Sequence, residues 1–360
     1  MSKTILKSPM RKNISIYALV IIGYIVMQCM IQTGNITSVL HGQLVPICAY
    51  IVMAISLNLT VGILGELSLG HAGFMSIGAF SGVVAATSLE SIIPFAPLRL
   101  AVSMAIAAAF AGAAGFLIGI PVLRLMGDYL AIVTLAFGEI IKHLINCLYI
   151  GIDSGGLSFG FLGTASDLNL KDDGAVIVNG PMGIAGINRI SNFTAGFILV
   201  MVTLFIVLNL INSRAGRAIM ALRDNRIAAE SVGIPVTKYK LMAFVTSAAI
   251  AGSAGALFAM NYSTVVATKF DFGTSILVLV FVVLGGLGNM MGSIIAATVL
   301  TILPEMLREI EQYRMLVYAV ILILVMIARN NASFMAYLDN LKNRIVNAAK
   351  KTRKGGASVG

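Results

Sequence analysis

Long apolar runs recur along the chain and predict its secondary structure. Runs such as 14–31 and 98–122 stay apolar at every phase, whereas the strands of a membrane barrel are about ten residues long and alternate in polarity. Each run is close to the roughly 20 residues that a helix needs to cross a hydrocarbon core about 30 Å thick. We therefore expect helices at 14–33, 44–64, 68–88, 98–123, 128–150, 194–211, 239–262, 275–303 and 313–329.

Glycines interrupt this pattern at two places. The first break, residues 65–73, reads GELSLGHAG and separates the second and third runs. The second break, residues 285–292, lies inside the eighth run, which we divide into two short or re-entrant segments near 275–288 and 292–303. This division brings the expected total to about ten transmembrane or re-entrant helices, all within an all-α membrane domain at 14–335.

The two glycine breaks have two possible roles. Non-helical backbone at membrane depth is stable only where protein or a water-filled cavity covers its polar groups. Paired broken segments also mark the binding sites of transporters, which makes both breaks candidate walls of a substrate pathway. The alternative is that the glycines only let helices pack closely, as we expect for the small-residue pairs Gly78/Gly82, Gly115/Gly119 and Gly252/Ala256.

The charged residues indicate how the chain is oriented. The N-terminal residues 1–13, the internal segment 212–238 and the C-terminal tail 336–360 are rich in Lys and Arg, whereas segment 151–193 carries four Asp. Basic segments stay on the cytoplasmic side, so both ends and segment 212–238 are expected inside and segment 151–193 outside. A net charge of +10 could also suit nucleic acid, but its clustering beside membrane runs favours orientation, and we expect no nucleic-acid partner.

Composition supports a membrane protein without covalent chemistry of its own. The chain is 58% hydrophobic and 11% charged, whereas soluble domains carry about 25% charged residues. Its three Cys and three His lack the spacing of a metal site. A loop of the form GxxxxGK[ST], which cradles nucleotide phosphates, is also missing from the sequence. We therefore expect lipid around the chain, neither metal nor cofactor bound to it, and no enzyme activity.

Segment 212–238 is polar enough to leave the membrane but too regular for a flexible linker. Ser213 can cap a first short helix, and Gly233 with Pro235 can end a second. Between them lie apolar positions flanked by arginines, namely Ala218, Ile219, Leu222, Ile227, Ala228 and Ala229. A short amphipathic projection of this kind can dock in a groove of a soluble protein.

Six blocks in order, together with this segment, resemble one family over nearly the whole chain. The pattern Ala228-Ala229-x-x-x-Gly233 resembles the coupling loop by which ABC importer permeases engage their ATPase subunits. The blocks are similar to those of the LivM-type permeases of branched-chain amino acid ABC importers: LNLTVG at 57–62, LSLGHAGF at 67–74, GDYLAIVTLAFGEI at 127–140, NGPMGI at 179–184, SRAGR at 213–217 and VLGGLG at 283–288.

The resemblance implies a multi-pass permease subunit of the bacterial cytoplasmic membrane, which imports branched-chain, hydrophobic amino acids by alternating access. It implies four partners: a second permease subunit, two ABC ATPases that bind ATP and Mg²⁺, and an extracytoplasmic amino-acid-binding protein. Related permeases carry urea or short amides, so these substrates remain alternatives. An ion-coupled amino acid carrier is a further alternative, which would need buried carboxylates or broken-helix carbonyls to hold its ion.

Two sets of residues are candidates for these roles. ATPase coupling is assigned to Ser213, Arg214, Gly216, Arg217, Leu222, Arg223, Asp224, Ala228, Ala229 and Gly233. The substrate pathway is assigned to Asn58, Glu66, Ser68, His71, Gly285, Gly286 and Gly288. Ionised groups inside a bilayer are functional candidates by default, but Glu66, Ser68 and His71 can also serve as interhelical hydrogen-bonding groups. Glu139 and His143, one helical turn apart, can form a structural pair.

Overall fold

The structure, a computed structural model, describes residues 7–34, 37–125, 127–153, 156–168, 170 and 174–307, together with single positions between 313 and 327. The chain forms two compact units, Met1–Ile302 and Leu303–Gly360, and the fold described below belongs to the first. The predicted crossing at 313–329, as a continuous helix, and the basic tail at 336–360 lie outside the described residues. The first six residues of the predicted N-terminal segment lie outside them as well.

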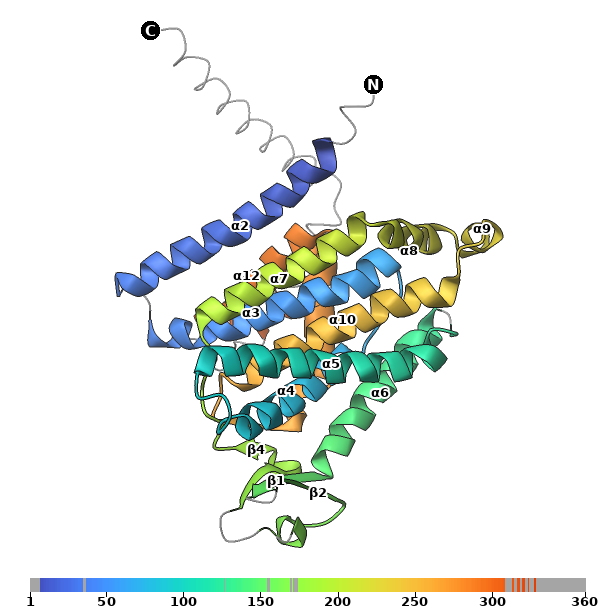
Figure 1. Ribbon diagram of the computed structural model, residues 1–360. Helices are drawn as coiled ribbons and strands as arrows, with labels where there is room; N and C mark the ends of the chain where they lie inside the picture. The colour runs from blue at the N-terminus through green and yellow to red at the C-terminus, as the bar shows by residue number, and fades with distance from the viewer. Residues whose placement is uncertain are drawn as a thin grey trace, which may run out of the picture. The chain divides into compact units, whose positions relative to one another are not determined.

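Most of the first unit is helical, and the helices occupy the predicted apolar runs (Figure 1). The long helices are α2 (Lys7–Gln32), α3 (Ser38–Asn58), α4 (His71–Ser88), α5 (Ala96–Val122), α6 (Asp128–Asn146), α7 (Phe193–Asn212) and α10 (Val236–Ala259). Two short helices, α8 (Arg214–Asp224) and α9 (Arg226–Ser231), lie between α7 and α10, and α11 (Phe272–Gly285) and α12 (Met290–Met306) follow.

Among the residues that the structure describes, five stretches are long and apolar enough to cross a membrane: Asn13–Gln32, Leu40–Leu64, Ala96–Val122, Phe193–Asn212 and Val236–Ala259. Helices α11 and α12 are apolar but shorter. These helices support a protein that crosses the membrane several times, but they do not confirm the predicted total of about ten. The division of the run at 275–303 into two segments is confirmed, because α11 ends at Gly285 and α12 begins at Met290.

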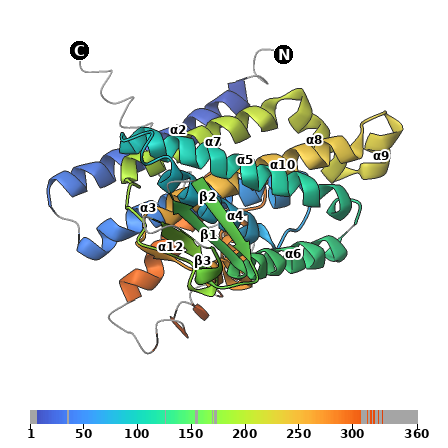
Figure 2. The ribbon, with the colours of Figure 1, turned by 60° about the horizontal axis from the view of Figure 1, so that its bottom comes forward.

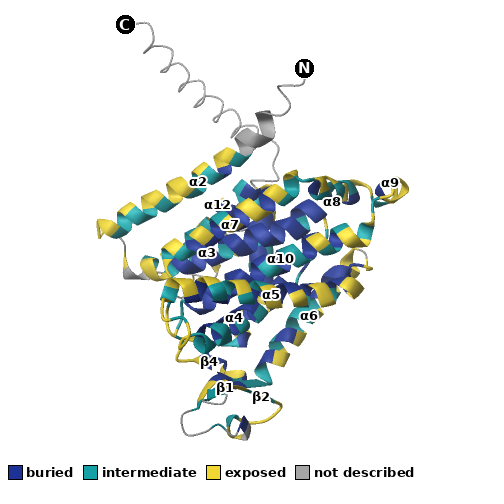
Figure 3. Cartoon of the chain, viewed as in Figure 1, coloured by how far each residue is buried: buried dark blue, intermediate teal, exposed yellow. Residues whose placement is uncertain are grey.

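Helix α10 forms the centre of the core, where it packs against α5, α4 and α3 (Figure 3). Small residues make this packing close: a Cβ atom on Gly78 of α4 would overlap the backbone of Gly252 in α10. A Cβ atom on Gly115 of α5 would lie 2.6 Å from the Cβ atom of Ala248. Glycine at these positions therefore allows the helices to approach closely, as the small-residue pairs predict.

Helix α2 lies at the edge of the first unit and exposes most of its apolar surface (Figures 1 and 3). Its best-defined contact is with α7, where the ring of Tyr24 stacks on Phe197 with 4.1 Å between ring centroids. The Tyr24 hydroxyl also lies 3.3 Å from the hydroxyl of Thr194. The same ring also stacks on Phe193, with 5.3 Å between ring centroids, and most of the α2 surface remains exposed.

The chain is mostly helical, as predicted, but a sheet lies where the sequence predicted the end of a helix at 128–150 and a loop at 151–193. Helix α6 ends at Asn146, not near residue 150, and a five-stranded antiparallel sheet in the order β2-β1-β3-β4-β5 follows (Figure 2). Its strands are β1 (Leu148–Asp153), β2 (Gly156–Phe161), β3 (Ala175–Asn179), β4 (Ile184–Ala185) and β5 (Thr264–Val265). Strand β5 comes from the segment after α10, so the sheet joins the 151–193 loop to a distant part of the chain.

Candidate functional site

A π-helical turn precedes the first glycine break. Helix α3 continues into the π-helix η1 (Leu59–Leu64), which ends at Gly65 with a φ of 82°. The backbone N–H groups of Gly65 and Glu66 both donate to the carbonyl oxygen of Thr60. A left-handed glycine is the usual end of a helix, because it has no Cβ to oppose this conformation. π-Helical turns are rare and concentrate at functional sites.

The second glycine break separates α11 from α12 and depends on the absence of side chains. Gly286 and Gly288 have φ angles of 104° and 77°, a region that other residues rarely adopt. A Cβ atom on Gly285 would collide with the backbone of Gly292 and Ser293. The four glycines therefore allow a sharp and closely packed turn between two apolar helices.

The second break meets the end of α3 at Asn58, a fully buried residue. Its Oδ1 atom accepts a hydrogen bond of 2.8 Å from the N–H of Gly288, and its Nδ2 atom donates one of 2.9 Å to Ser293 Oγ. Gly62 makes this approach possible, because a Cβ atom there would overlap both Asn58 Oδ1 and the Gly288 nitrogen. The structure thus brings Asn58 and Gly288 together, and it adds Gly62 and Ser293, which the sequence reasoning missed.

The later part of the first break lies in the packed interior. Ser56 Oγ lies 2.5 Å from His71 Nε2, and the N–H of Ala72 donates to Ser275 Oγ at 3.1 Å. The N–H of Leu69 donates to Thr134 Oγ1 at 3.0 Å. These bonds pair His71 and two backbone N–H groups of the break with neighbouring helices, which is the alternative role considered for His71. The hydroxyl of Ser68 is buried and has no hydrogen-bond partner among the described residues.

Two ionisable residues of the predicted pathway region find partners that the sequence did not indicate. Glu66 forms an ion pair with Lys240 of α10, and their side chains are 15% and 6% exposed. Glu139 pairs with Lys142 on the same helix, so the hypothesis that Glu139 bonds to His143 is wrong. Because the Glu66–Lys240 pair is largely buried, removal of one partner would leave an unpaired charge inside the protein.

Segment 212–238 forms the two short helices that the sequence predicts. Ser213 Oγ accepts a hydrogen bond of 3.1 Å from the N–H of Gly216 and so caps α8. Asn225 Oδ1 accepts one of 3.0 Å from the N–H of Ala228 and caps α9. Gly233 follows α9 with a φ of 83°, as expected for a residue that ends a helix. The Ser213 and Gly233 signals are thus confirmed, whereas the Asn225 cap was missed.

Burial divides nine of the ten predicted coupling residues into two groups, and the tenth, Ser213, is half-buried. Gly216, Leu222 and Ala229 are buried within the protein, as is Ile219, so the apolar surface predicted to include Ile219, Leu222 and Ala229 does not expose these three residues. The exposed members are Arg214, Arg217, Arg223, Asp224, Ala228 and Gly233. Two apolar side chains at the outer end of the segment are also strongly exposed, Ile227 at 80% and Val232 at 75%.

Helix α8 contacts the first break directly. The Nη1 atom of Arg223 donates a hydrogen bond of 3.0 Å to the carbonyl oxygen of Gly62. Gly65 lies against the aliphatic part of the same side chain, since a Cβ atom on Gly65 would be 2.5 Å from Arg223 Cγ. A polar pocket of about 330 Å³ lies beside this contact and is lined by Leu64, Gly65, Glu66, Leu67, Gly127, Asp128, Leu222, Arg223, Arg226 and Lys240.

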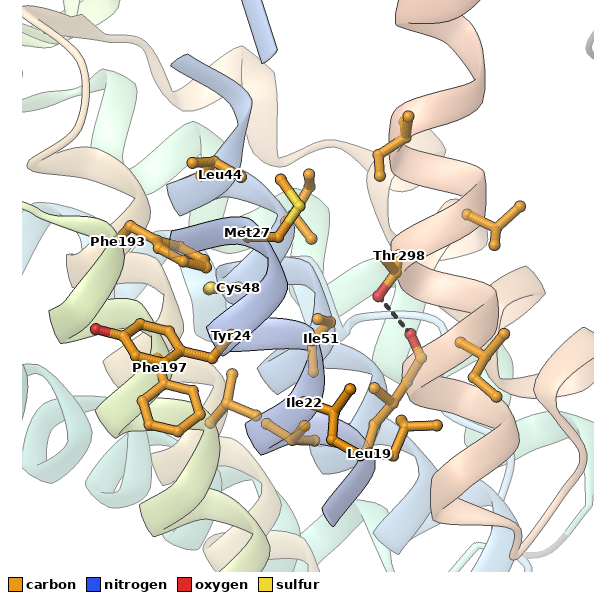
Figure 4. A pocket seen from close by; sticks show the side chains of 18 residues that line it. Leu19, Ile22, Tyr24, Met27, Leu44, Cys48, Ile51, Phe193, Phe197 and Thr298 are labelled. Carbon is orange, nitrogen blue, oxygen red and sulfur yellow. Dashed lines mark hydrogen bonds between the residues drawn. The ribbon is translucent and has the colours of Figure 1, made fainter. Parts of the chain in front are cut away.

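A second pocket of about 400 Å³ lies between α2, α3, α7 and α12 and has a different character (Figure 4). Its lining includes Leu19, Met27, Ile51 and Phe193, and the hydroxyl of Thr298 is bonded to the carbonyl of Ile294 within α12. An apolar wall suits hydrocarbon but offers no group for the ammonium or carboxylate of an amino acid. Charged groups around an open space lie instead at the polar pocket.

Metal ligation finds no support in the part of the chain that the structure describes. Among those residues, no three His, Cys, Asp or Glu side chains gather closely enough to hold a metal ion. The chemistry available at the site is therefore hydrogen bonding and ion pairing by Arg223, Lys240, Glu66 and Asn58.

Comparison with known proteins gives a consistent result. The family described as branched-chain amino acid transport system / permease component matches residues 39–326. The high-affinity branched-chain amino acid transport system permease proteins LivM of Salmonella typhimurium and Escherichia coli are 36% and 37% identical to this chain over 288 residues. Each match covers 78% of this chain and 66% of the relative.

A more distant relative carries a different name. The fructose import permease protein FruG of Bifidobacterium longum is 29% identical over 127 residues, which cover 33% of this chain and 37% of FruG. No solved structure matches the chain with significance. The family match extends across both glycine breaks and the two short helices. The chain therefore belongs to the family of branched-chain amino acid transport permeases.

Proposed function

We propose that this chain is the permease subunit of an ATP-driven ABC importer that moves branched-chain, hydrophobic amino acids across the bacterial cytoplasmic membrane by alternating access. Family membership, the two LivM relatives and the several apolar helices support this function. The observation that carries the proposal is the capped pair α8–α9, which contacts the first break on one side and exposes apolar and basic side chains on the other.

The exposed side of the pair fits an ATPase subunit. Ile227 and Val232 form an apolar tip, and Arg214 and Arg217 are exposed nearby along the chain. An apolar tip can enter a groove of a soluble partner, while arginines pair with carboxylates at its rim. Two such ATPases bind ATP and Mg²⁺, and their closure moves the α8–α9 pair, which shifts the two breaks.

Other surfaces receive other partners in this proposal. A second permease subunit completes the translocation pore, and lipid covers the exposed face of α2. The sheet faces the outside, where an extracytoplasmic amino-acid-binding protein delivers the substrate. Both chain ends lie in the cytoplasm, as the clusters of basic residues indicate.

The substitution Ile227→Asp tests the contact with the ATPase. The side chain is 80% exposed, so the fold is expected to survive, whereas a carboxylate in the groove would be repelled. We expect the ATPases recovered with the purified chain to fall by about tenfold. Phe159→Asp, at a 67% exposed position of β2, is the matched control and should leave recovery unchanged. Normal recovery and normal substrate-stimulated ATP hydrolysis with Ile227→Asp would refute the proposed coupling surface.

The transported substrate and the energy source need separate measurements. We expect the reconstituted importer to take up labelled leucine, isoleucine or valine only with ATP and the binding protein. Competition by urea or acetamide would favour the amide alternative, and competition by fructose would favour the substrate named for FruG. Uptake by the purified chain alone under an ion gradient would favour an ion-coupled carrier instead.

A further inference from the structure

The end of the π-helix η1 is completed by a side chain from a distant part of the sequence. The last carbonyl groups of a helix have no partner within it and need one from elsewhere. The carbonyl oxygen of Thr60 accepts hydrogen bonds from the N–H groups of Gly65 and Glu66. The carbonyl oxygen of Gly62 instead accepts one from Arg223 Nη1, which is 161 residues away in sequence. A cation is also favourable at a helix C-terminus, because the helix dipole is negative there.

Gly62 also touches the second break. Glycine is required at this position, since any side chain would overlap Asn58 Oδ1 and the nitrogen of Gly288. Asn58 is itself bonded to Gly288 and to Ser293 of α12. The π-helix therefore contacts both α8 and the turn between α11 and α12, and a displacement of Gly62 must move the contact with Gly288.

We propose that Arg223 is a positioning residue that transmits movement of the α8–α9 pair to both glycine breaks by capping the π-helix. This inference rests on the proposed function and changes the role of Arg223, which was predicted from the sequence to be an ATPase-coupling residue. The guanidinium group is aimed at Gly62, and Asp224 Oδ1 holds it there with hydrogen bonds of 3.0 Å from Nε and 2.9 Å from Nη2. Three of its donors are thus used within this chain.

The buried ion pair Glu66–Lys240 gives the first break a second fixed point. Glu66 directly follows the glycine that ends the π-helix, and Lys240 lies near the start of α10, the helix after α9. Both Arg223 and Lys240 line the polar pocket, whose open space leaves room for the Arg223 side chain to move. A shift of α8 relative to α10 therefore changes the position of Gly62 relative to Glu66.

The test measures substrate molecules moved per ATP hydrolysed by the complete importer, purified and reconstituted with its ATPases and binding protein. We expect Arg223→Ala to lower this ratio by about tenfold, the effect of losing one hydrogen bond from a charged group. The amount of ATPase recovered with the purified Arg223→Ala chain should stay normal. Arg223→Lys keeps a cation near the Gly62 carbonyl but lacks the planar fork that Asp224 holds, so it should restore the ratio in part.

Arg217→Ala is the matched control on the same helix. Its Nη1 atom bonds only to the carbonyl oxygen of Asn212 at 3.3 Å among the contacts of the described residues, and it does not reach either break. We expect Arg217→Ala to lower the recovery of ATPases without changing the ratio in the complexes that do assemble. The same result for Arg223→Ala would assign Arg223 to the ATPase surface and overturn the proposal.

Asp224→Asn is a second variant that keeps the proposal testable if Arg223→Ala does not fold. Asp224 is 68% exposed in its side chain, so the substitution is mild, and the loss of its charge should lower the ratio by about threefold. If the wild-type importer couples transport to ATP hydrolysis and both Asp224→Asn and Arg223→Lys keep its ratio, the role proposed for Arg223 is overturned while the proposed function stands. A wild-type chain that recruits no ATPase would overturn the proposed function together with this inference.

Discussion

The two glycine breaks are held in different ways. The first is anchored by charged side chains from distant elements, namely Arg223 at the Gly62 carbonyl before it and Lys240 on Glu66 within it. The second is held by the neutral amide of Asn58 and by backbone packing between Gly285 and Gly292. Charged contacts are directional and stronger than neutral ones. In the proposed function, the first break is therefore suited to be moved by the α8–α9 pair, and the second to follow it through Asn58.

The largest effect is expected from forcing η1 away from the second break. Gly62→Leu places a side chain where the Gly288 nitrogen and Asn58 Oδ1 lie, and we expect a loss of about 4–5 kcal/mol in stability, the upper range for one substitution. Transport at equal membrane abundance should disappear. Gly23→Leu in α2, where a Cβ atom meets nothing within 4 Å, is the control and should transport normally. A functional Gly62→Leu variant would show that η1 need not touch the second break.

The charged anchor of the first break is the next target. Lys240→Met should lower the free energy of unfolding, measured by titration with a denaturing detergent, by about 3 kcal/mol because Glu66 is left buried and unpaired. The double variant Glu66→Gln with Lys240→Met removes both charges and should recover part of that loss. Equal destabilisation of the single and double variants would mean that the ion pair contributes nothing beyond packing.

The neutral anchor of the second break should give a smaller effect. Asn58→Ala removes the acceptor of the Gly288 N–H and the donor to Ser293 Oγ. We expect a loss of about 2 kcal/mol in the same detergent titration, since the backbone N–H of Gly288 loses its acceptor. Ser81→Ala removes only a hydroxyl that bonds within α4 and should cost much less. If Asn58→Ala were as stable as the wild type, the second break would need no link to α3.

The sequence predicted the places of the breaks but not their contacts. Gly65 and Gly286 stand out because glycine interrupts an apolar run, and their positive φ angles agree with this interpretation. The pairing of Asn58 with Gly288 spans 230 residues, and hydropathy contains no information on which distant segments meet. Arg223 was found as a charged residue, but its direction toward Gly62 depends on how α8 packs against η1.

The sheet was missed for a related reason. Its strands have two to six residues, too short for an alternating pattern to stand out beside apolar helical runs. Strand β5 also comes from beyond α10, so no local signal could place it next to β4. The alternation of exposed Leu157, Phe159 and Phe161 along β2 was the one available indication.

The smallest expected effect separates the cap of α8 from the contact that α8 makes with the first break. Ser213→Ala removes the side-chain acceptor of the Gly216 N–H and should cost about 1 kcal/mol. Asn225→Ala removes the equivalent cap of α9. The hydrogen bond to η1 comes from Arg223 of α8 and not from α9. If movement passes through α8, Ser213→Ala should lower the ratio of transport to ATP hydrolysis slightly, while Asn225→Ala should mainly reduce ATPase recovery. Equal effects of the two cap substitutions on that ratio would mean that the two short helices act as one rigid unit.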